Sequence, residues 1–241
     1  MAVLLLCGCG QKSETAAATP AQAVTASAAQ SSTVRPVSTG VTPEQFGAKG
    51  DGIADDLRAL QAAMQQASAS GRPLELTAGA VYRFSSCLGL PSGLTIRGNG
   101  AVLLSDIQYP DLKEDRVAVE LMKDSDDDRA HDVRLENVTF RAADSCQANY
   151  MLRVMLARNV EFVGCTFDCE PNEWGRCAAD LYGGNENIRF EGCVFRQMTS
   201  GASGGIWVRN WTDRVESRNI RFQNCEFYKS GADELLAVWG W

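Results

Sequence analysis

The apolar positions of the chain follow one recurring pattern. Four eight-residue segments carry it, and they occupy residues 133–140 (VRLENVTF), 160–167 (VEFVGCTF), 188–195 (IRFEGCVF) and 220–227 (IRFQNCEF). Successive starts are 27, 28 and 32 residues apart. Self-similarity at a period of roughly 20 to 50 residues is typical of solenoids, in which each repeat stacks on its neighbour. The pattern therefore predicts a solenoid.

Within each segment the first and third residues are apolar, which is the period-2 pattern of a strand with one buried face. The fifth residue is always asparagine or glycine, which enter the left-handed backbone region at little cost and so turn the chain: Asn137, Gly164, Gly192 and Asn224. After this turn two further sets recur: Val138, Cys165, Cys193 and Cys225, then Phe140, Phe167, Phe195 and Phe227. Stacked coils would align each set as a ladder with steps of about 4.8 Å. We therefore predict an all-β solenoid, a right-handed parallel β-helix.

Each coil needs another strand, and the sequence offers residues 117–122, 151–156, 178–182, 205–209 and 235–239. Alternation assigns the inward side chains as Val119, Leu121, Leu152, Val154, Ala179, Leu181, Ile206, Val208, Leu236 and Val238. The outward side chains are then Glu120, Arg153, Asp180, Tyr182, Trp207, Arg209 and Trp239. This face stands apart from the others, because aromatic rings, a carboxylate and guanidinium groups lie on adjacent coils.

A short helix is expected ahead of the coils. Asp55 is a plausible N-cap, and Gly71 followed by Pro73 would stop the helix. Between them an apolar stripe recurs at helical spacing: Leu57, Leu60, Met64 and Ala67. Such a helix would cover the open end of the first coil.

The segment FGAKGDG at residues 46–52, followed by Asp55, Asp56 and the helix, resembles the opening of the pectate lyase superfamily, which includes rhamnogalacturonase, epimerase-like and phage tailspike β-helices. The likeness continues through Gly79, Tyr82 and LTIRGNG at residues 94–100. Leu57 departs from the usual threonine, and residues 77–79 (TAG) depart from Pro-x-Gly. The resemblance implies a β-helix directed at polysaccharides, but the opening motif supplies no catalytic residue, and the paired-Asp, His-Gly and Arg-x-Lys motifs of polygalacturonases are absent.

Three parts of the chain are distinguished by composition. Residues 1–9 end in Leu-Cys-Gly-Cys and resemble a shortened lipoprotein signal, with Cys9 as the lipidated residue. Residues 10–42 are rich in Ala, Ser and Thr and read as a disordered tether. Residues 43–241 then form the β-helix, which is interpreted as incomplete at its C-terminus or covered there by another chain. We expect a lipid-anchored protein of the bacterial cell envelope, or a secreted one.

The outward face described above is the candidate binding site. Rings stack on sugar faces, while acids and arginines hydrogen-bond hydroxyls or uronate carboxylates. The expected substrate-binding residues are Arg153, Tyr182, Trp207, Trp239 and Trp174. The competing interpretation is that the exposed tryptophans meet a partner subunit in a homo-oligomer.

Two kinds of catalysis fit this face. A glycosidase needs two carboxyl groups, and Asp180 is the best candidate for one, with Glu234, Glu173 or Asp233 as the second. A lyase would use Arg209 or Arg153 as a base, often with calcium; otherwise no cofactor is expected. The alternatives are a non-catalytic adhesin or tailspike-like module, and an inactive fragment of a longer enzyme.

Net charge restricts the classes of partner, and the position of the cysteines restricts their roles. A net charge of −7 argues against nucleic acid and anionic membrane surfaces as partners, which leaves the lipid anchor as the expected membrane contact. Of nine cysteines, the three in the repeats are expected in the core as small apolar residues. Cys169 and Cys177 flank a loop and would pair in an oxidising compartment.

Overall fold

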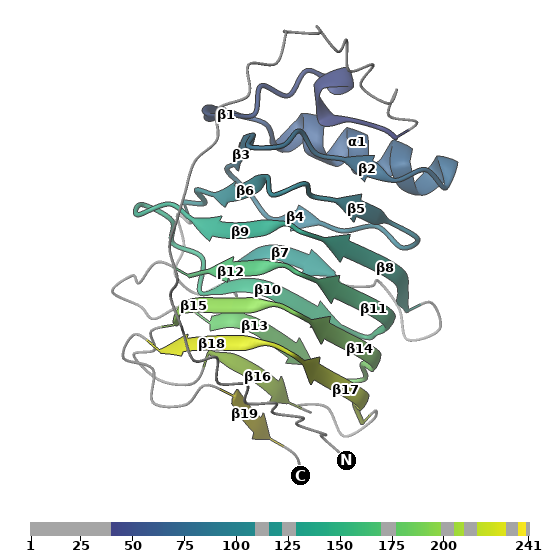
Figure 1. Cartoon of the computed structure of the whole chain (residues 1–241), viewed down its shortest axis with the longest axis vertical. Coiled ribbons are helices and arrows are strands. Elements are labelled where there is room, and N and C mark those ends of the chain that lie inside the picture. Colours follow the sequence, from purple (N-terminus) through teal and green to yellow (C-terminus); the bar gives the residue numbers. More distant parts are fainter. Residues whose placement is uncertain are drawn as a thin grey trace, which may run out of the picture.

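The computed structural model describes residues 40–108, 116–121, 129–169, 177–198, 205–209, 216–229 and 236–239. Within them the chain winds as a parallel β-helix with a single α-helix at its N-terminal end (Figure 1). The predicted solenoid is therefore confirmed. No helix in this part of the chain is long and apolar enough to cross a bilayer.

Three parallel sheets run along the solenoid, and each coil adds one strand to each sheet. Sheet I contains β4 (Leu88–Gly89), β7 (Val117–Leu121), β10 (Tyr150–Met155), β13 (Cys177–Tyr182), β16 (Ile206–Arg209) and β19 (Leu236–Trp239). Sheet II contains β2 (Leu74–Glu75), β5 (Thr95–Arg97), β8 (Ala130–Glu136), β11 (Ala157–Val163), β14 (Glu186–Glu191) and β17 (Arg218–Gln223). Sheet III contains β1 (Asp51–Asp55), β3 (Val81–Phe84), β6 (Val102–Ser105), β9 (Thr139–Ala142), β12 (Thr166–Asp168), β15 (Val194–Met198) and β18 (Glu226–Lys229).

The turn from sheet II to sheet III lies at the predicted positions. Asn137, Gly164, Gly192 and Asn224 have φ of 52°, 61°, 59° and 52°. Most L-residues would lose about 1–2 kcal/mol in this region, which explains why the repeats use only asparagine and glycine here. Coils also approach closely, since a Cβ on Gly98 would lie 2.3 Å from the Asn137 carbonyl oxygen.

Two aromatic ladders fill the core behind sheets II and III. Rings of Phe140, Phe167, Phe195 and Phe227 stack at 4.9, 4.9 and 5.1 Å between centroids. Rings of Phe162, Phe190 and Phe222 stack at 4.8 Å in each step. The two ladders meet edge-on, as between Phe162 and Phe167 at 6.0 Å, a geometry that aromatic pairs favour.

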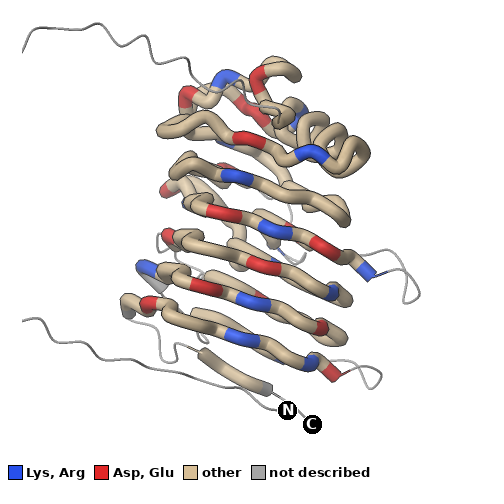
Figure 2. The backbone as a smooth tube through the Cα atoms, turned by 45° about the vertical axis from the view of Figure 1, so that its right-hand side comes forward, with Lys and Arg blue, Asp and Glu red and all other residues tan. Residues whose placement is uncertain are grey.

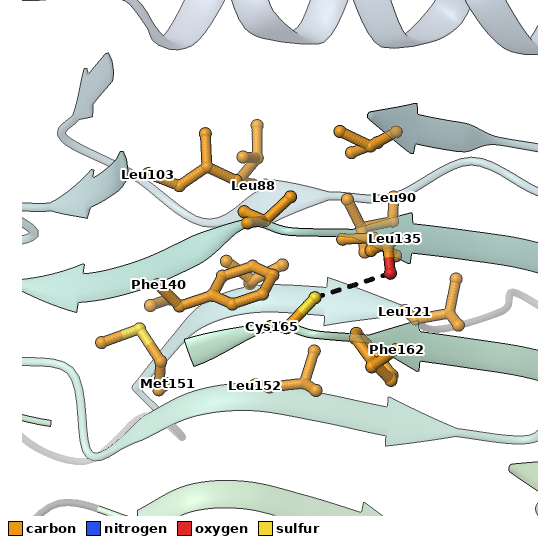
Figure 3. Close-up of a cluster of buried hydrophobic side chains, with 14 of the residues drawn as sticks. Leu88, Leu90, Leu103, Leu121, Leu135, Phe140, Met151, Leu152, Phe162 and Cys165 are labelled. Atoms are coloured by element: carbon orange, nitrogen blue, oxygen red, sulfur yellow. Dashed lines mark hydrogen bonds between the residues drawn. The ribbon is translucent and has the colours of Figure 1, made fainter. Parts of the chain in front are cut away.

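The repeat cysteines form a third ladder inside. Cys165 and Cys193 are fully buried, and Cys225 is half-buried in the last such coil. Each thiol donates to a backbone carbonyl of the preceding coil, as Cys165 does to Leu135 at 3.5 Å (Figure 3). No disulfide joins the described cysteines, so the expected pairing of Cys169 with Cys177 is not formed in this structure.

A short 3₁₀-helix, η1 (Pro43–Phe46), and α1 (Leu57–Ser70) cover the first coils. The predicted stripe is confirmed: Leu60, Met64 and Ala67 are buried and Leu57 packs against the core. Gly71 ends the helix with φ of 63°.

The N-cap of α1 is Asp56, so the assignment to Asp55 was wrong by one residue. Asp56 is buried, and its carboxylate is satisfied there because it accepts hydrogen bonds from the Lys49 and Gly50 backbone N–H groups at 2.7 and 3.0 Å. That fold-back positions the glycine-rich loop against the helix. Asp55 still accepts a hydrogen bond from the Leu57 N–H at 3.2 Å.

The side chains of sheet I that were predicted to point inward are buried on every strand before β19. Val208 is 2% exposed, whereas Val238, its register partner on β19, is 46% exposed. The register confirms that Val238 lies on the inner face, as predicted, but its side chain is exposed in this structure. The physical reason is that no described strand pairs beyond β19 to cover it.

The aromatic ladders give a stability prediction. Phe190→Ala removes a fully buried ring that stacks on both neighbours, and should lower the free energy of unfolding by about 3–5 kcal/mol in chemical denaturation. Tyr228→Ala is the control, because this ring is 51% exposed and its loss should cost under about 1 kcal/mol. Similar losses of unfolding free energy in both variants would show that the stacked phenylalanine rings do not stabilise the core.

Candidate functional site

The register of sheet I builds one outward ladder across four coils. The strand register pairs Glu120 on β7 with Arg153 on β10, and Arg153 with Asp180 on β13. Asp180 pairs in turn with Trp207 on β16. Parallel strands repeat about every 4.8 Å, so each side chain lies beside the next. One step along the same strands, Tyr182 pairs with Arg209.

Asp180 is the centre of this ladder. Its Oδ1 accepts a hydrogen bond from Arg209 Nε at 2.7 Å, and its Oδ2 accepts one from Arg209 Nη2 at 2.7 Å. Oδ2 also accepts from Arg153 Nε at 3.1 Å, and Arg153 Nη2 lies 3.1 Å from the same oxygen. The carboxylate thus binds two guanidinium groups and has no exposed surface.

Aromatic rings surround the two arginines. The Arg209 guanidinium carbon lies 4.8 Å from the Trp207 ring centroid and 4.9 Å from that of Tyr182. The Arg153 guanidinium carbon lies 4.6 Å from the Tyr150 centroid. Contacts within about 6 Å are attractive cation–π interactions. We call Arg153, Asp180, Arg209 and these three rings the arginine cluster.

The electrostatics of the cluster fix its charge state. Burial disfavours the charged form of Arg209, but the hydrogen bonds and negative charge of Asp180 outweigh it and hold the pKa of Arg209 above its usual value. Arg209 therefore stays a cation. The side chains of Arg209 and Arg153 are 16% and 9% exposed, so the arginine cluster meets solvent through its cations and rings rather than through its acid.

These positions correct the expectation of a solvent-facing acid. Alternation placed Asp180 and Arg153 on the outer side of sheet I, and the structure has them there, but Asp180 is fully buried and Arg153 is only 7% exposed. The arginines bind over the carboxylate and Tyr150 lies over Arg153. Alternation predicts the side of a sheet, not what covers that side.

Tyr150 is the member of the cluster that sequence reasoning missed. Tyr150 lies two residues before Leu152 and four before Val154, both of which point inward, so strand alternation predicts that it also points into the core. At the first position of β10 its ring instead contacts Arg153 and lies 5.8 Å from the Arg209 guanidinium carbon. No periodic signal marks such a residue at a strand end.

Glu120 extends the ladder away from the cluster. Cys87 Sγ lies 3.9 Å from its Oε2. Burial, followed by the charge of Glu120, raises the pKa of the Cys87 thiol to about 12. The thiol therefore stays protonated near neutral pH and is not a nucleophile there.

Several predicted site residues lie outside the described residues. These are Trp174, Glu173, Asp233, Glu234 and the lipidation candidate Cys9. Trp239 stands on β19 in register with Arg209. Among the described residues, no three His, Cys, Asp or Glu side chains gather in a way that could hold a metal ion.

Comparison with known proteins adds a family and a relative. A family model described as rhamnogalacturonase A/epimerase, pectate lyase-like matches residues 41–228. The capsule K30/K69-specific depolymerase 1 of Klebsiella phage K5-2 is 43% identical over 60 residues. That match covers 25% of this chain and only 7% of the depolymerase.

Solved structures share the fold at low identity. ORF18 of Geobacillus virus E2 gives a TM-score of 0.60 at 18% identity, over 78% of this chain and 36% of that one. The surface protein and adhesin PfbA of Streptococcus pneumoniae gives 0.60 at 16% identity, over 84% of this chain and 56% of PfbA. The chain thus spans only part of each, and the likeness shows the fold alone.

The buried carboxylate gives a prediction about stability. Asp180→Asn leaves two buried guanidinium groups without their shared anion and should lower the free energy of unfolding by about 3–5 kcal/mol. Asp106→Asn is the matched control. Asp106 pairs with Arg83 at 2.7 Å in a more exposed site, so its loss should cost under about 1 kcal/mol. Denaturant titration of both variants checks this, and equal losses would contradict the central position of Asp180.

Proposed function

The chain belongs to the rhamnogalacturonase A/epimerase, pectate lyase-like family, and we propose from this that it binds a polysaccharide along the outer face of sheet I. One observation carries the proposal: the arginine cluster places cations and three aromatic rings together on that face. Rings offer flat surfaces to sugars, and guanidinium groups suit carboxylates. A capsule-specific depolymerase among the relatives supports a polysaccharide as the ligand.

An acidic glycan fits the cluster best. Arg209 remains charged at all ordinary pH values, because Asp180 raises its pKa. The same ion pair fixes its orientation, so little side-chain entropy is lost when a ligand binds. A uronate carboxylate near Arg209, with a neighbouring sugar ring against Tyr182 or Trp207, would use both features.

Cleavage of the bound glycan is the second function that we propose. Glu120, the partly buried carboxylate of the ladder, would act as one acid of a hydrolysis, with Glu234 as the proposed second acid. Asp180 lies two coils away, at about 9.6 Å, just beyond the upper limit of about 9.5 Å for an inverting pair. Because Asp180 is buried and bound by both arginines, it would hold Arg209 in place instead. Elimination fits less well, because Arg209 would have to lose a proton that Asp180 stabilises. Calcium at the sugar carboxylate would be the aid for such a reaction.

We further propose that the protein works outside the cell or on its surface. Extended polysaccharides such as capsules are found there, and the relatives with this fold include a surface adhesin. The lipidation of Cys9 stays a proposal of the same kind.

Binding is tested with the full chain and a panel of acidic and neutral polysaccharides, with and without calcium, by isothermal titration. Arg209→Gln should weaken acidic-glycan binding about tenfold, the loss expected for about 1.4 kcal/mol, and Trp207→Ala should weaken acidic and neutral glycans alike. Arg97→Gln is the control, since Arg97 lies on sheet II and is 53% exposed. Unchanged binding by both site variants would refute the proposal.

Cleavage is tested on the same samples by following new reducing ends together with the ultraviolet absorbance of unsaturated products. Glu120→Gln should abolish hydrolysis while leaving binding within about twofold of the wild type. Reducing ends that rise together with absorbance would indicate elimination instead. Folded protein that binds glycans but releases no product would leave the binding function alone.

A further inference from the structure

A second polar ladder runs along the outer face of sheet II, away from the arginine cluster. Figure 2 shows acidic and basic positions interspersed along the strands on this side of the solenoid. Asn159 on β11, Asn187 on β14 and Asn219 on β17 are exposed and share φ values of 56° or 57°. Asp132 occupies the equivalent position on β8 with φ of 55°.

These side chains form one directed chain of hydrogen bonds. Asn159 Nδ2 donates to Asp132 Oδ1 at 2.9 Å, Asn187 Nδ2 donates to Asn159 Oδ1 at 3.1 Å, and Asn219 Nδ2 donates to Asn187 Oδ1 at 2.6 Å. Arg221 Nε then donates to Asn219 Oδ1 at 2.7 Å. The amide dipoles point the same way, with their N–H ends toward the Asp132 carboxylate and their oxygens toward the Arg221 guanidinium, so they stabilise the anion at one end and the cation at the other.

A row of charged side chains lies beside this ladder, and its carboxylates do not continue to the last strand of the sheet. Glu161 on β11 bridges two arginines, since it is ion-paired with Arg134 and lies 3.6 Å from Arg189 Nη1. On β17 the next residue in register is Arg221. Among the described residues no carboxylate pairs with Arg221, because β17 carries Gln223 where β14 carries Glu191.

The ladder and the charge row border a groove of about 430 Å³. Its lining includes the three asparagines, Glu161, Arg189 and Arg221. Arg189 is held by Glu161 and Glu191, and Arg221 by Asn219. Gln223, Glu161 and Glu191 bind the three nitrogens of the Arg189 guanidinium, so the cation that the groove presents is Arg221, beside a row of amides that repeats about every 4.8 Å.

We propose that this groove is a second binding site, which takes a carboxylate-bearing segment of a glycan. The carboxylate lies against Arg221, with which no carboxylate among the described residues pairs, because guanidinium groups bind carboxylates in a planar, paired geometry. The asparagine amides, each with donor and acceptor capacity, take hydroxyls of adjoining sugars. The site is separate from sheet I; only the sugar nature of its ligand rests on the proposed function.

The test follows backbone amide NMR shifts of the isotopically labelled full chain during titration with oligogalacturonate, an uncharged maltooligosaccharide or inorganic sulfate. Saturable shifts on β14 and β17 are expected with oligogalacturonate. Arg221→Gln should weaken this binding about tenfold. Asn219→Asp should weaken it similarly, because the new carboxylate would pair with Arg221, and Asp132 shows that the position accepts aspartate. Arg97→Gln, on the far part of the same sheet, should change nothing.

Each outcome decides between the two sites. Unchanged affinity at β14 and β17 in both variants overturns the second site, as does sulfate that binds there as tightly as the oligosaccharide, which would make it a simple anion site. Shifts confined to β13 and β16 overturn it while supporting the proposed function. Shifts at β14 and β17 with none at β13 and β16 support the second site and count against glycan binding on sheet I.

Discussion

The in-register stacking of parallel coils is the constraint on which the whole structure depends. Because each strand pairs with its equivalent one coil away, every inward position meets a like side chain, as Phe162, Phe190 and Phe222 do at 4.8 Å. A slip of one residue would turn these rings to the outer face. The tight turn at positions such as Gly192 supports the register, since only Gly192 and Cys193 separate β14 of sheet II from β15 of sheet III.

The same register generates the outer surfaces. A side chain on the outer face has fixed neighbours one coil above and below, so a single acid between two arginines becomes an organised group. On sheet I this places Asp180 between Arg153 and Arg209 and buries it. On sheet II it produces a row of asparagines that ends at Arg221. Both surfaces thus arise from the repetition that builds the core, without a separate scaffold.

The repeats were enough to predict the solenoid, the left-handed turns and the phenylalanine and cysteine ladders, because each depends on spacing within one short segment. The covering of Asp180 and the position of Tyr150 were not predictable in this way. They depend on which side chains from neighbouring coils close over an outer face, and alternation carries no information on that. The shift of the N-cap from Asp55 to Asp56 is similar, since it depends on the loop at Lys49 and Gly50. The asparagine row could have been read from the sequence, since Asn159, Asn187 and Asn219 each directly precede the first residue of a repeat segment. That their amides hydrogen-bond in series could be learned only from the structure.

The central claim is that coil register builds a glycan-binding face on sheet I around the arginine cluster. A crystal structure of the full chain with an acidic oligosaccharide tests it most directly. The account predicts a sugar carboxylate beside Arg209 and a sugar ring against Tyr182 or Trp207, with Asp180 still bound by both arginines. A well-ordered sugar bound elsewhere while this face stays bare, or an Asp180 separated from Arg153 and Arg209, would contradict it.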